Sequence, residues 1–336
     1  MFVNVVAFME KLHTKNIDII IPCYNSNKTL FRTLSSIVTQ TISDQCNIYI
    51  CDDCSSCSYT NDIDNFSKYI DITYLRSETN RGVGMARQMG LDNCNSPYVC
   101  FIDSDDTFAN SLSLELLYQE IKNNQCDIVS GRFVNDVRNT DKVNIYEYSK
   151  ELTWLHGKIY SRKFIDDNNI HFSDLRLNED GMFNQCFALK NARIGYVNYD
   201  IYNWISNSES LTRKDEPLTR FNILKSYIDG SLRTYNYAVN NQPCNQEVLN
   251  LQVSHALVLI YFYYNEISLT MTNDYAEKYL YYCKLFYKNC YSNFTDKITD
   301  DELRIRYRDI LSSSDCYKSY FPIISFYEFC EIIGSE

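Results

Sequence analysis

Three aspartates that follow a short apolar segment are the residues whose chemistry is easiest to interpret. Asp103, Asp105 and Asp106 come directly after residues 98–102, which are apolar, mostly β-branched or aromatic, and preceded by Pro97. This pattern predicts a buried strand that ends in acids. Carboxylates so close together raise one another's pKa unless a cation lies among them. The segment therefore predicts either a site for a divalent metal or an ordinary acidic turn.

Two earlier strands are predicted to end in polar residues as well. Segments 17–21 and 47–51 are apolar and alternate with helical patterns, which is typical of parallel strands in an α/β domain. Ligands of such sheets bind beyond the carboxyl ends of the strands, so the polar residues there should share one site. The residues that follow the two segments are Tyr24, Asn25, Asp52 and Asp53.

A nucleotide-sugar is a ligand that these strand ends would suit. Tyr24 can stack on a base, and Asp52 or Asp53 can accept a hydrogen bond from an imide N–H. Asp103 can reach a ribose, and Asp105 can hold Mg²⁺ or Mn²⁺, cations that prefer carboxylates together with phosphate oxygens.

A turn at residues 80–84 follows the third predicted strand, residues 72–75. Arg81 and Arg87, in and after this turn, could place positive charge beside phosphates. The glycines at 82 and 84 do not have the spacing of a dinucleotide-binding fingerprint, and the turn follows the wrong strand for one.

Taken in order, these motifs resemble the successive signatures of family 2 glycosyltransferases, over about residues 15–215. The resemblance implies a GT-A fold, which is an α/β, Rossmann-like, mostly parallel sheet flanked by helices. The segments that carry it are Ile19–Asn25, Asp52–Ser55, Asn80–Gly82, Ala86–Arg87, Phe101–Asp106, Trp154, Gly157–Tyr160 and Asn178–Gly181.

The resemblance also implies a role for each matched residue. Asp180 would be the general base with Glu179 beside it, although acids at a helix start are also expected on dipole grounds alone. Asp105 would ligate Mn²⁺ or Mg²⁺. The donor-binding residues would be Pro22, Tyr24, Asn25, Asp52, Asp53, Asn80, Arg81, Gly82, Arg87, Asp103 and Ser104. The acceptor side would include Trp154, His156 and Lys158, with a structural role for His156 equally open.

The activity that the resemblance implies is an inverting transfer of a hexosyl or N-acetylhexosaminyl group. The donor would be a nucleotide-sugar, most plausibly a UDP-sugar, and the acceptor a hydroxyl of a glycan, glycolipid or protein. A nucleotidyltransferase and a non-catalytic sugar-nucleotide-binding protein stay open as alternatives. One departure from the family pattern is Trp204, which stands where a basic residue is common; Arg213 could compensate. Residues 206–214 could form a lid or an ordinary surface loop.

Composition limits the class of protein. The 336 residues carry a formal net charge of −11, which argues against nucleic acid as the main partner. We expect the 14 cysteines to be reduced in a cytoplasmic protein, since there is no signal-peptide pattern. Cys51, Cys54 and Cys57 have metal-site spacing but no evident fourth ligand. Association with the inner face of the membrane and homo-oligomerisation stay open.

The chain changes character after Pro217. We expect a GT-A catalytic domain over residues 1–215 and an aromatic-rich helical region over residues 216–336. The run 259–264 is too apolar for a solvated face and should be buried. Burial against the catalytic domain is the first expectation; a dimer contact or an acceptor platform are alternatives.

Overall fold

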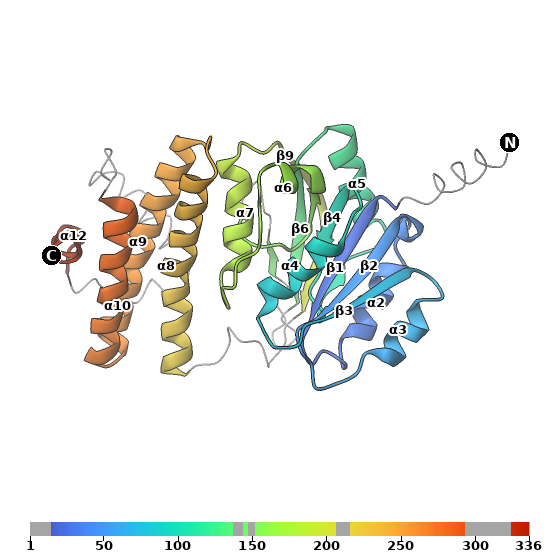
Figure 1. Ribbon diagram of the computed structural model, residues 1–336, viewed down its shortest axis with the longest axis horizontal. Coiled ribbons are helices and arrows are strands. Elements are labelled where there is room, and N and C mark those ends of the chain that lie inside the picture. The colour runs from blue at the N-terminus through green and yellow to red at the C-terminus, as the bar shows by residue number, and fades with distance from the viewer. Residues whose placement is uncertain (1–14, 137–143, 147–151, 206–215, 293–323, 336) are drawn as a thin grey trace. The chain divides into compact units, whose positions relative to one another are not determined.

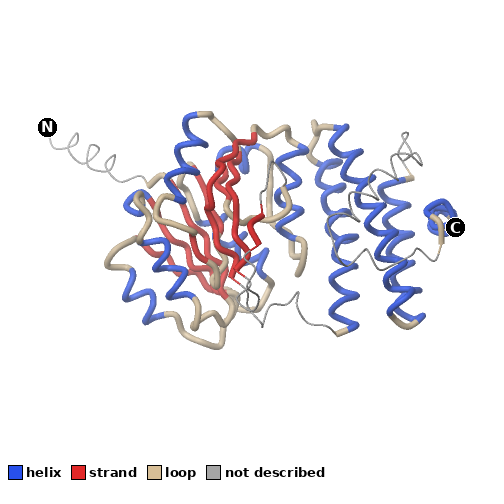
Figure 2. The backbone as a smooth tube through the Cα atoms, turned by 180° about the vertical axis from the view of Figure 1, so that it is seen from behind, coloured by secondary structure: helices blue, strands red, loops and turns tan. Residues whose placement is uncertain are grey.

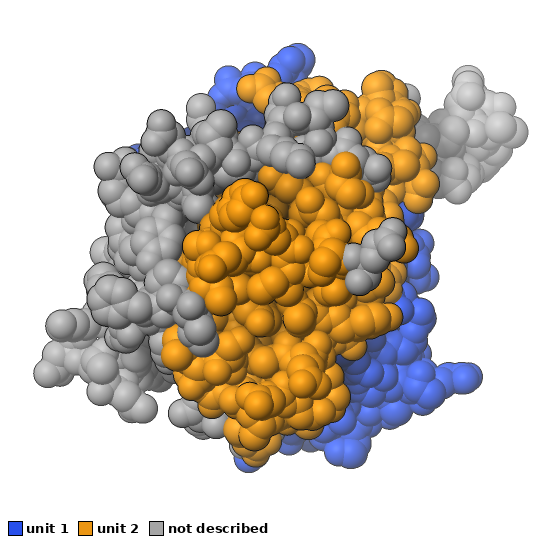
Figure 3. Space-filling view, turned by 90° about the vertical axis from the view of Figure 1, so that its left-hand side faces the viewer, with its two compact units in different colours: residues 1–187, 192–208 blue, residues 188–191, 209–336 orange. Residues whose placement is uncertain are grey.

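The computed structural model describes residues 15–136, 144–146, 152–205, 216–292 and 324–335. The chain divides into two compact units, which are coloured separately in Figure 3. Unit 1 contains residues 1–187 and 192–208, and unit 2 contains residues 188–191 and 209–336. The predicted domain boundary at 215 and the predicted lid at 206–214 both lie outside the described residues.

Unit 1 is built on one mixed sheet of nine strands, shown as red tubes in Figure 2. Their order is β3-β2-β1-β4-β8-β6-β9-β5, and β7 pairs with β6. The strands are β1 (Ile17–Cys23), β2 (Cys46–Asp52), β3 (Asp71–Arg76), β4 (Tyr98–Phe101), β5 (Thr107–Phe108), β6 (Ile128–Asp136), β7 (Asn144–Tyr146), β8 (Lys158–Ser161) and β9 (Ile194–Ile205). The helices beside them are α2 (Leu30–Val38), α3 (Thr60–Phe66), α4 (Val83–Asn93), α5 (Ser113–Asn123), α6 (Arg162–Asp167) and α7 (Glu179–Leu189) (Figure 1).

The central strand β1 is buried over its whole length because helices cover both of its faces. Ile19 and Ile21 join a core that includes Leu34 of α2. Ile20 points to the other face, where it meets Gly90 of α4 so closely that a Cβ atom there would lie 2.6 Å from the Ile20 Cγ2. A strand buried on both faces needs a continuous apolar run, which explains the sequence pattern at residues 17–21.

The sheet is parallel over its first four ordered strands and mixed beyond them. Strands β3, β2, β1 and β4 pair in parallel, as the alternation of strand and helix predicts. The four-residue strand β8 then pairs antiparallel with both β4 and β6. Strand β9 is continuous over twelve residues, and its pairing with β6 shifts register near Arg132. The register shift lets the two strands stay paired on both sides of Arg132.

Unit 2 is helical, and its helices pack against one another. They are α8 (Pro217–Asn240), α9 (Gln246–Thr270), α10 (Asn273–Phe286), a π-helical turn (Tyr287–Tyr291) and α12 (Phe326–Gly334). The apolar run in α9 is mostly buried, and Tyr261 contacts the ring of Phe329 with centroids 5.5 Å apart. Ring packing inside the unit therefore accounts for much of the apolar character of this run. None of the helices in the described ranges combines the length and apolarity needed to span a bilayer.

Candidate functional site

The carboxyl ends of β1, β2 and β4 lie at one edge of the sheet because these strands are parallel neighbours. Tyr24 follows β1 and is 55 % exposed, so its ring is accessible. Asn25 has a left-handed φ of 53°, and its side-chain oxygen accepts a hydrogen bond of 2.8 Å from the backbone N–H of Ser56. Pro22 is buried inside β1. The loops after β1 and β2 are therefore bound to each other.

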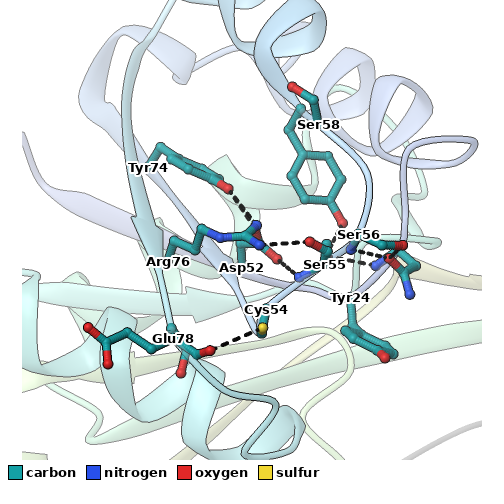
Figure 4. Close-up of polar contacts among 12 residues, drawn as sticks. Tyr24, Asp52, Cys54, Ser55, Ser56, Ser58, Tyr74, Arg76 and Glu78 are labelled. Carbon is teal, nitrogen blue, oxygen red and sulfur yellow. Dashed lines mark hydrogen bonds and ion pairs between the residues drawn. The ribbon is translucent and has the colours of Figure 1, made fainter.

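Asp52 is buried at the end of β2 and is surrounded by donors (Figure 4). Its Oδ1 accepts a bond of 2.8 Å from the backbone N–H of Ser55, and its Oδ2 accepts a bond of 2.6 Å from the hydroxyl of Tyr74. Arg76 forms an ion pair with the same Oδ2. Burial would raise the pKa of Asp52, but the bonds from Ser55 and Tyr74 and the charge of Arg76 lower it below its ordinary value. Asp52 is thus a charged carboxylate at neutral pH.

Arg76 is the site residue that the sequence interpretation missed. It ends β3 opposite Asp52 in the parallel register, and its side chain is 43 % exposed. Its Nη2 also donates a bond of 2.7 Å to the carbonyl oxygen of Ser55. A basic residue at the carboxyl end of the strand next to an acidic one was the available signal.

Asp53 and Asn80 support the turn before α4. The carboxylate of Asp53 accepts bonds of 2.8 and 2.7 Å from the backbone N–H groups of Arg81 and Gly82. The side-chain oxygen of Asn80 accepts a hydrogen bond from Arg176. Gly82 has a φ of 97°, a conformation that favours glycine. These polar groups of Asp53 and Asn80 are engaged by the protein, whereas the side chain of Arg81 is exposed.

The acidic segment after β4 divides into buried and half-buried members. Asp106 is buried, and it accepts bonds of 2.7 Å from the Tyr202 hydroxyl and 2.8 Å from the backbone N–H of Ile205. Burial and the neighbouring carboxylates of Asp103 and Asp105 raise the pKa of Asp106 well above its ordinary value. Asp103 and Asp105 are half-buried. Asp106 therefore supports the segment, and the other two are the more accessible acids.

Ser104 and Arg32 hold the backbone of this segment. The hydroxyl of Ser104 bonds to that of Ser26 at 2.7 Å, which links the ends of β4 and β1. Arg32 of α2 donates a bond of 2.5 Å to the carbonyl oxygen of Asp105. The predicted site residue Ser104 thus positions the acidic segment.

Arg87 lies between the acidic segment and the start of α7. Its Nη2 is 2.6 Å from Asp103 Oδ1, and its Nη1 is 2.7 Å from Glu179 Oε1. Only 5 % of the residue is exposed. Burial alone would raise the pKa of Asp103. The charge of Arg87 and the interaction with His156 outweigh burial, so that the pKa lies below its ordinary value. Both ends of the guanidinium are occupied by carboxylates, so this placement does not support the predicted direct contact of Arg87 with phosphates.

Glu179 and Asp180 form the first turn of α7. Glu179 is buried, and burial together with the charge of Asp180 raises its pKa to about 7. Burial also raises the pKa of Asp180, although the charge of Arg87 opposes this. Asp180 is partly exposed; its Oδ1 accepts a bond of 2.7 Å from the N–H of Gly181, and its Oδ2 has no hydrogen-bond partner among the described residues. Asp180 is thus the more exposed acid of this turn, whereas Glu179 is buried.

An aromatic group surrounds His156 on the other side of Asp103. The imidazole stacks on Tyr202 with ring centroids 4.9 Å apart, and Trp204 lies 5.5 Å away. The His156 Nε2 is 3.8 Å from Asp103 Oδ2, while its Nδ1 is buried without a hydrogen bond. In the described ranges, one set of ligand atoms converges closely enough for a metal: those of Asp103, Asp106 and His156, all within 4.8 Å of one another.

Trp154 and Lys158 lie beside this aromatic group. The Trp154 ring is 5.8 Å from that of Phe133. Lys158 is 3 % exposed, and its Nζ donates a bond of 2.6 Å to the carbonyl oxygen of Trp154. Burial lowers the pKa of Lys158 to about 8, although the charge of Asp180 opposes the shift. The Lys158 ammonium group is therefore engaged inside the unit.

The cysteines with metal-like spacing do not converge on a ligand set. Cys51 is buried, and the Sγ of Cys54 donates to the carbonyl oxygen of Glu78 at 3.3 Å. All thirteen cysteines in the described part of the chain are free thiols. This agrees with the expectation of reduced cysteines.

Part of the chain matches a known protein family. Residues 18–175 match the model of "Glycosyl transferase family 2". The chain is 29 % identical over 223 residues to the glycosyltransferase GlyA of Streptococcus pneumoniae, covering 59 % of this chain and 31 % of GlyA. It is 26 % identical over 206 residues to TarS of Staphylococcus aureus, a poly(ribitol-phosphate) β-N-acetylglucosaminyltransferase, covering 57 % of this chain and 36 % of TarS. The chain thus spans about a third of the length of these two relatives.

Solved structures agree with the fold. Residues 1–349 of TarS in complex with UDP-GlcNAc superpose with a TM-score of 0.69 at 19 % identity, covering 82 % of this chain and 81 % of that one. A mannosyltransferase from Pyrobaculum calidifontis in complex with GDP-Man and Mn²⁺ gives a TM-score of 0.54 at 11 % identity, covering 96 % and 87 %. Residues 18–175 therefore match glycosyl transferase family 2, and unit 1 has the GT-A fold that the sequence motifs predict.

Proposed function

We propose that this protein transfers a sugar from a nucleotide-sugar to a hydroxyl group, with inversion at the anomeric carbon. The observation that carries the proposal is the bridge from Asp103 through Arg87 to Glu179. This bridge connects two parts of the site. One is the sheet edge at the carboxyl ends of the strands, where nucleotides bind in α/β proteins, and the other is the start of α7, which carries Glu179 and Asp180. Donor-side and acceptor-side groups are thus available in one place.

The donor is a UDP-sugar in this proposal. Tyr24 offers an exposed ring for stacking on the base, and Arg76 offers guanidinium N–H groups to a pyrimidine carbonyl. The complex of the structural neighbour TarS with UDP-GlcNAc supports this choice. The transferred group is a hexosyl or N-acetylhexosaminyl group.

Asp103 and His156 would hold a divalent cation, together with Asp105, the metal ligand that the family resemblance implies. Two carboxylates and an imidazole match the ligands of Mn²⁺, and Mg²⁺ also accepts carboxylates with phosphate oxygens. The imidazole Nε2 of His156 already faces Asp103, whereas the two carboxylate oxygens of Asp106 accept hydrogen bonds from Tyr202 and Ile205. When bound, the cation would neutralise charge on the donor diphosphate.

Asp180 acts as the general base. Its Oδ2 accepts the proton of the acceptor hydroxyl while that oxygen attacks the anomeric carbon, and the bond from that carbon to the donor diphosphate breaks to release the nucleoside diphosphate. A carboxylate whose pKa is raised by burial is a better proton acceptor than an ordinary one. Glu179 is held by Arg87 and supports the turn.

The acceptor is a hydroxyl of a glycan, glycolipid or protein. The rings of Trp154, His156 and Trp204 offer apolar surface beside the acids, which suits the face of a sugar. The relative TarS is a poly(ribitol-phosphate) β-N-acetylglucosaminyltransferase, which is consistent with a glycan-like acceptor here. We place the reaction in the cytoplasm, consistent with the free thiols.

A donor screen tests the proposal. The purified full chain is incubated with UDP-, GDP- and CDP-sugars and Mn²⁺, and released nucleoside diphosphate and free sugar are measured. We expect slow hydrolysis of a UDP-sugar, faster turnover when an acceptor glycan is added, and the opposite anomer in the product by NMR. Release of pyrophosphate from a nucleoside triphosphate would instead indicate a nucleotidyltransferase. Nucleotide binding without turnover would indicate a binding protein.

A further inference from the structure

Arg87 connects three elements that are far apart along the chain. It belongs to α4, while Asp103 follows β4 and Glu179 begins α7. Its two terminal nitrogens contact one carboxylate each, at 2.6 and 2.7 Å. Such charge-assisted bonds in a buried place are short and directional. The separation of the two guanidinium nitrogens therefore sets the separation of the two carboxylates.

The contact on Asp103 also determines which of its oxygens is available. Arg87 occupies Oδ1, and Oδ2 is left on the side of His156, 3.8 Å from the imidazole Nε2. The contact on Glu179 anchors the first turn of α7, in which the next residue is Asp180. One side chain thus orients a donor-side acid and holds the turn that carries the base.

We propose that Arg87 is a positioning residue that couples the donor-side carboxylate of Asp103 to the base-bearing turn of α7, and that it contacts neither donor nor acceptor. The inference rests on the proposed function for the roles of Asp103 and Asp180. A lysine cannot replace Arg87, because one ammonium group lacks the planar fork that reaches two carboxylates at fixed geometry.

A rival interpretation makes Arg87 a direct phosphate ligand. The two interpretations differ in what Arg87→Lys should do. A phosphate ligand replaced by lysine keeps its charge, so donor binding would weaken and kcat would change little. If Arg87 is a positioning residue, its replacement by lysine removes the guanidinium that holds both carboxylates, and Asp180 moves. A displacement of about 1 Å can lower kcat about 100-fold.

The test combines Arg87→Lys with a double-mutant cycle. UDP affinity is measured by calorimetry and kcat by donor turnover for the wild type, Asp103→Asn, Glu179→Gln and the double variant. Arg162→Lys is the matched control, since this arginine is also partly buried and donates to backbone carbonyls of Leu91 and Cys94. Thermal unfolding of each variant checks that it folds.

We expect Arg87→Lys to lower kcat about 100-fold with less than about fivefold change in UDP affinity, while the control changes neither. Asp103 and Glu179 share Arg87 as an ion-pair partner, so their substitutions should be coupled by about tenfold in UDP affinity, and the coupling should vanish in an Arg87→Met background. The inference would be overturned if the effects of Asp103→Asn and Glu179→Gln on UDP affinity simply multiplied in the double variant. It would also be overturned if Arg87→Lys lowered UDP affinity and kept kcat. If Arg87→Lys fails to fold, the Asp103/Glu179 cycle still decides it. A wild type that binds UDP without turnover contradicts the proposed function, whereas the affinity cycle still tests the coupling.

Discussion

Gly84 and Glu179 pack so closely that there is no room for a side chain between α4 and α7. A Cβ atom on Gly84 would lie 2.9 Å from the Glu179 Cγ and 2.7 Å from the carbonyl oxygen of Ser173. The first turn of α7 is therefore held by the contact of the Glu179 side chain with Gly84 as well as by its ion pair with Arg87. Gly181, two residues along from Glu179, has room for a methyl group, since the nearest atom to its Cβ position, the Thr153 carbonyl oxygen, is at a van der Waals distance of 3.7 Å.

This contrast predicts opposite effects of two alanine substitutions. Gly84→Ala should destabilise the protein by about 1–3 kcal/mol and lower turnover, because the backbone at Ser173 and the turn at Glu179 must move. Gly181→Ala should be neutral or stabilise the helix by about 0.5–1 kcal/mol. Urea unfolding and donor turnover check both. Equal stability of the two variants would show that the α4–α7 contact does not constrain the turn.

Tyr24 should contribute to donor affinity and little to stability. Its exposed ring is available for stacking on a base, an interaction of about 1–3 kcal/mol. Tyr24→Ala should therefore raise the Kd for UDP about 5- to 150-fold while the melting temperature stays unchanged. Tyr69→Ala, at another exposed tyrosine, is the control. If both variants bind UDP like the wild type, Tyr24 does not line the base site.

Removal of divalent metal should weaken donor binding. If Asp105 and His156 hold a cation beside the diphosphate, EDTA should raise the Kd for UDP about tenfold or more, and Mn²⁺ should restore it. Asp105→Asn and His156→Gln should reduce the effect of Mn²⁺, whereas Asp167→Asn, at an exposed helix position, should not. A UDP affinity that is the same in EDTA and in Mn²⁺ would exclude the metal from the donor site.

Lys158 should make stability depend on pH in the alkaline range. Burial lowers its pKa to about 8 from the ordinary value of 10.5, so between these pH values the unfolded chain binds more protons than the folded one. The wild type should therefore gain stability relative to Lys158→Met as the pH rises from 8 to 10.5, by up to about 3 kcal/mol. Urea unfolding under reducing conditions measures the difference. Lys163→Met, at a side chain that is 81 % exposed, shows the effect of losing a surface lysine. A difference between the wild type and Lys158→Met that does not change with pH would contradict the shift.

Local pattern predicts the parallel half of the sheet well. Residues 17–21 and 98–102 became β1 and β4 with ends that differ by two residues or fewer, because strands buried on both faces have continuous apolar runs. The strand β8 was not predicted, since four residues carry too little periodicity and its place depends on pairing with β4 and β6.

The sequence indicates which residues belong to the site, but not which partners most of them contact. The sequence indicates that Asp52 and Asp53 end a strand together, but not that Asp52 pairs with Arg76 while Asp53 holds the turn at Gly82, because successive residues point to opposite sides. Likewise Arg87 lies near the site in the sequence pattern, but its carboxylate partners follow from tertiary packing.

The most direct test of the account compares Asp180→Asn with the wild type in donor binding and in transfer. The substitution removes the proton acceptor and keeps the size of the side chain. We predict that transfer to an acceptor falls about 100- to 10,000-fold while the Kd for UDP stays within about threefold. Glu179→Gln, at the neighbouring residue, is the matched variant and should keep more activity. Near-normal transfer by Asp180→Asn with unchanged UDP binding would contradict the assignment of Asp180 as the base of a glycosyltransferase.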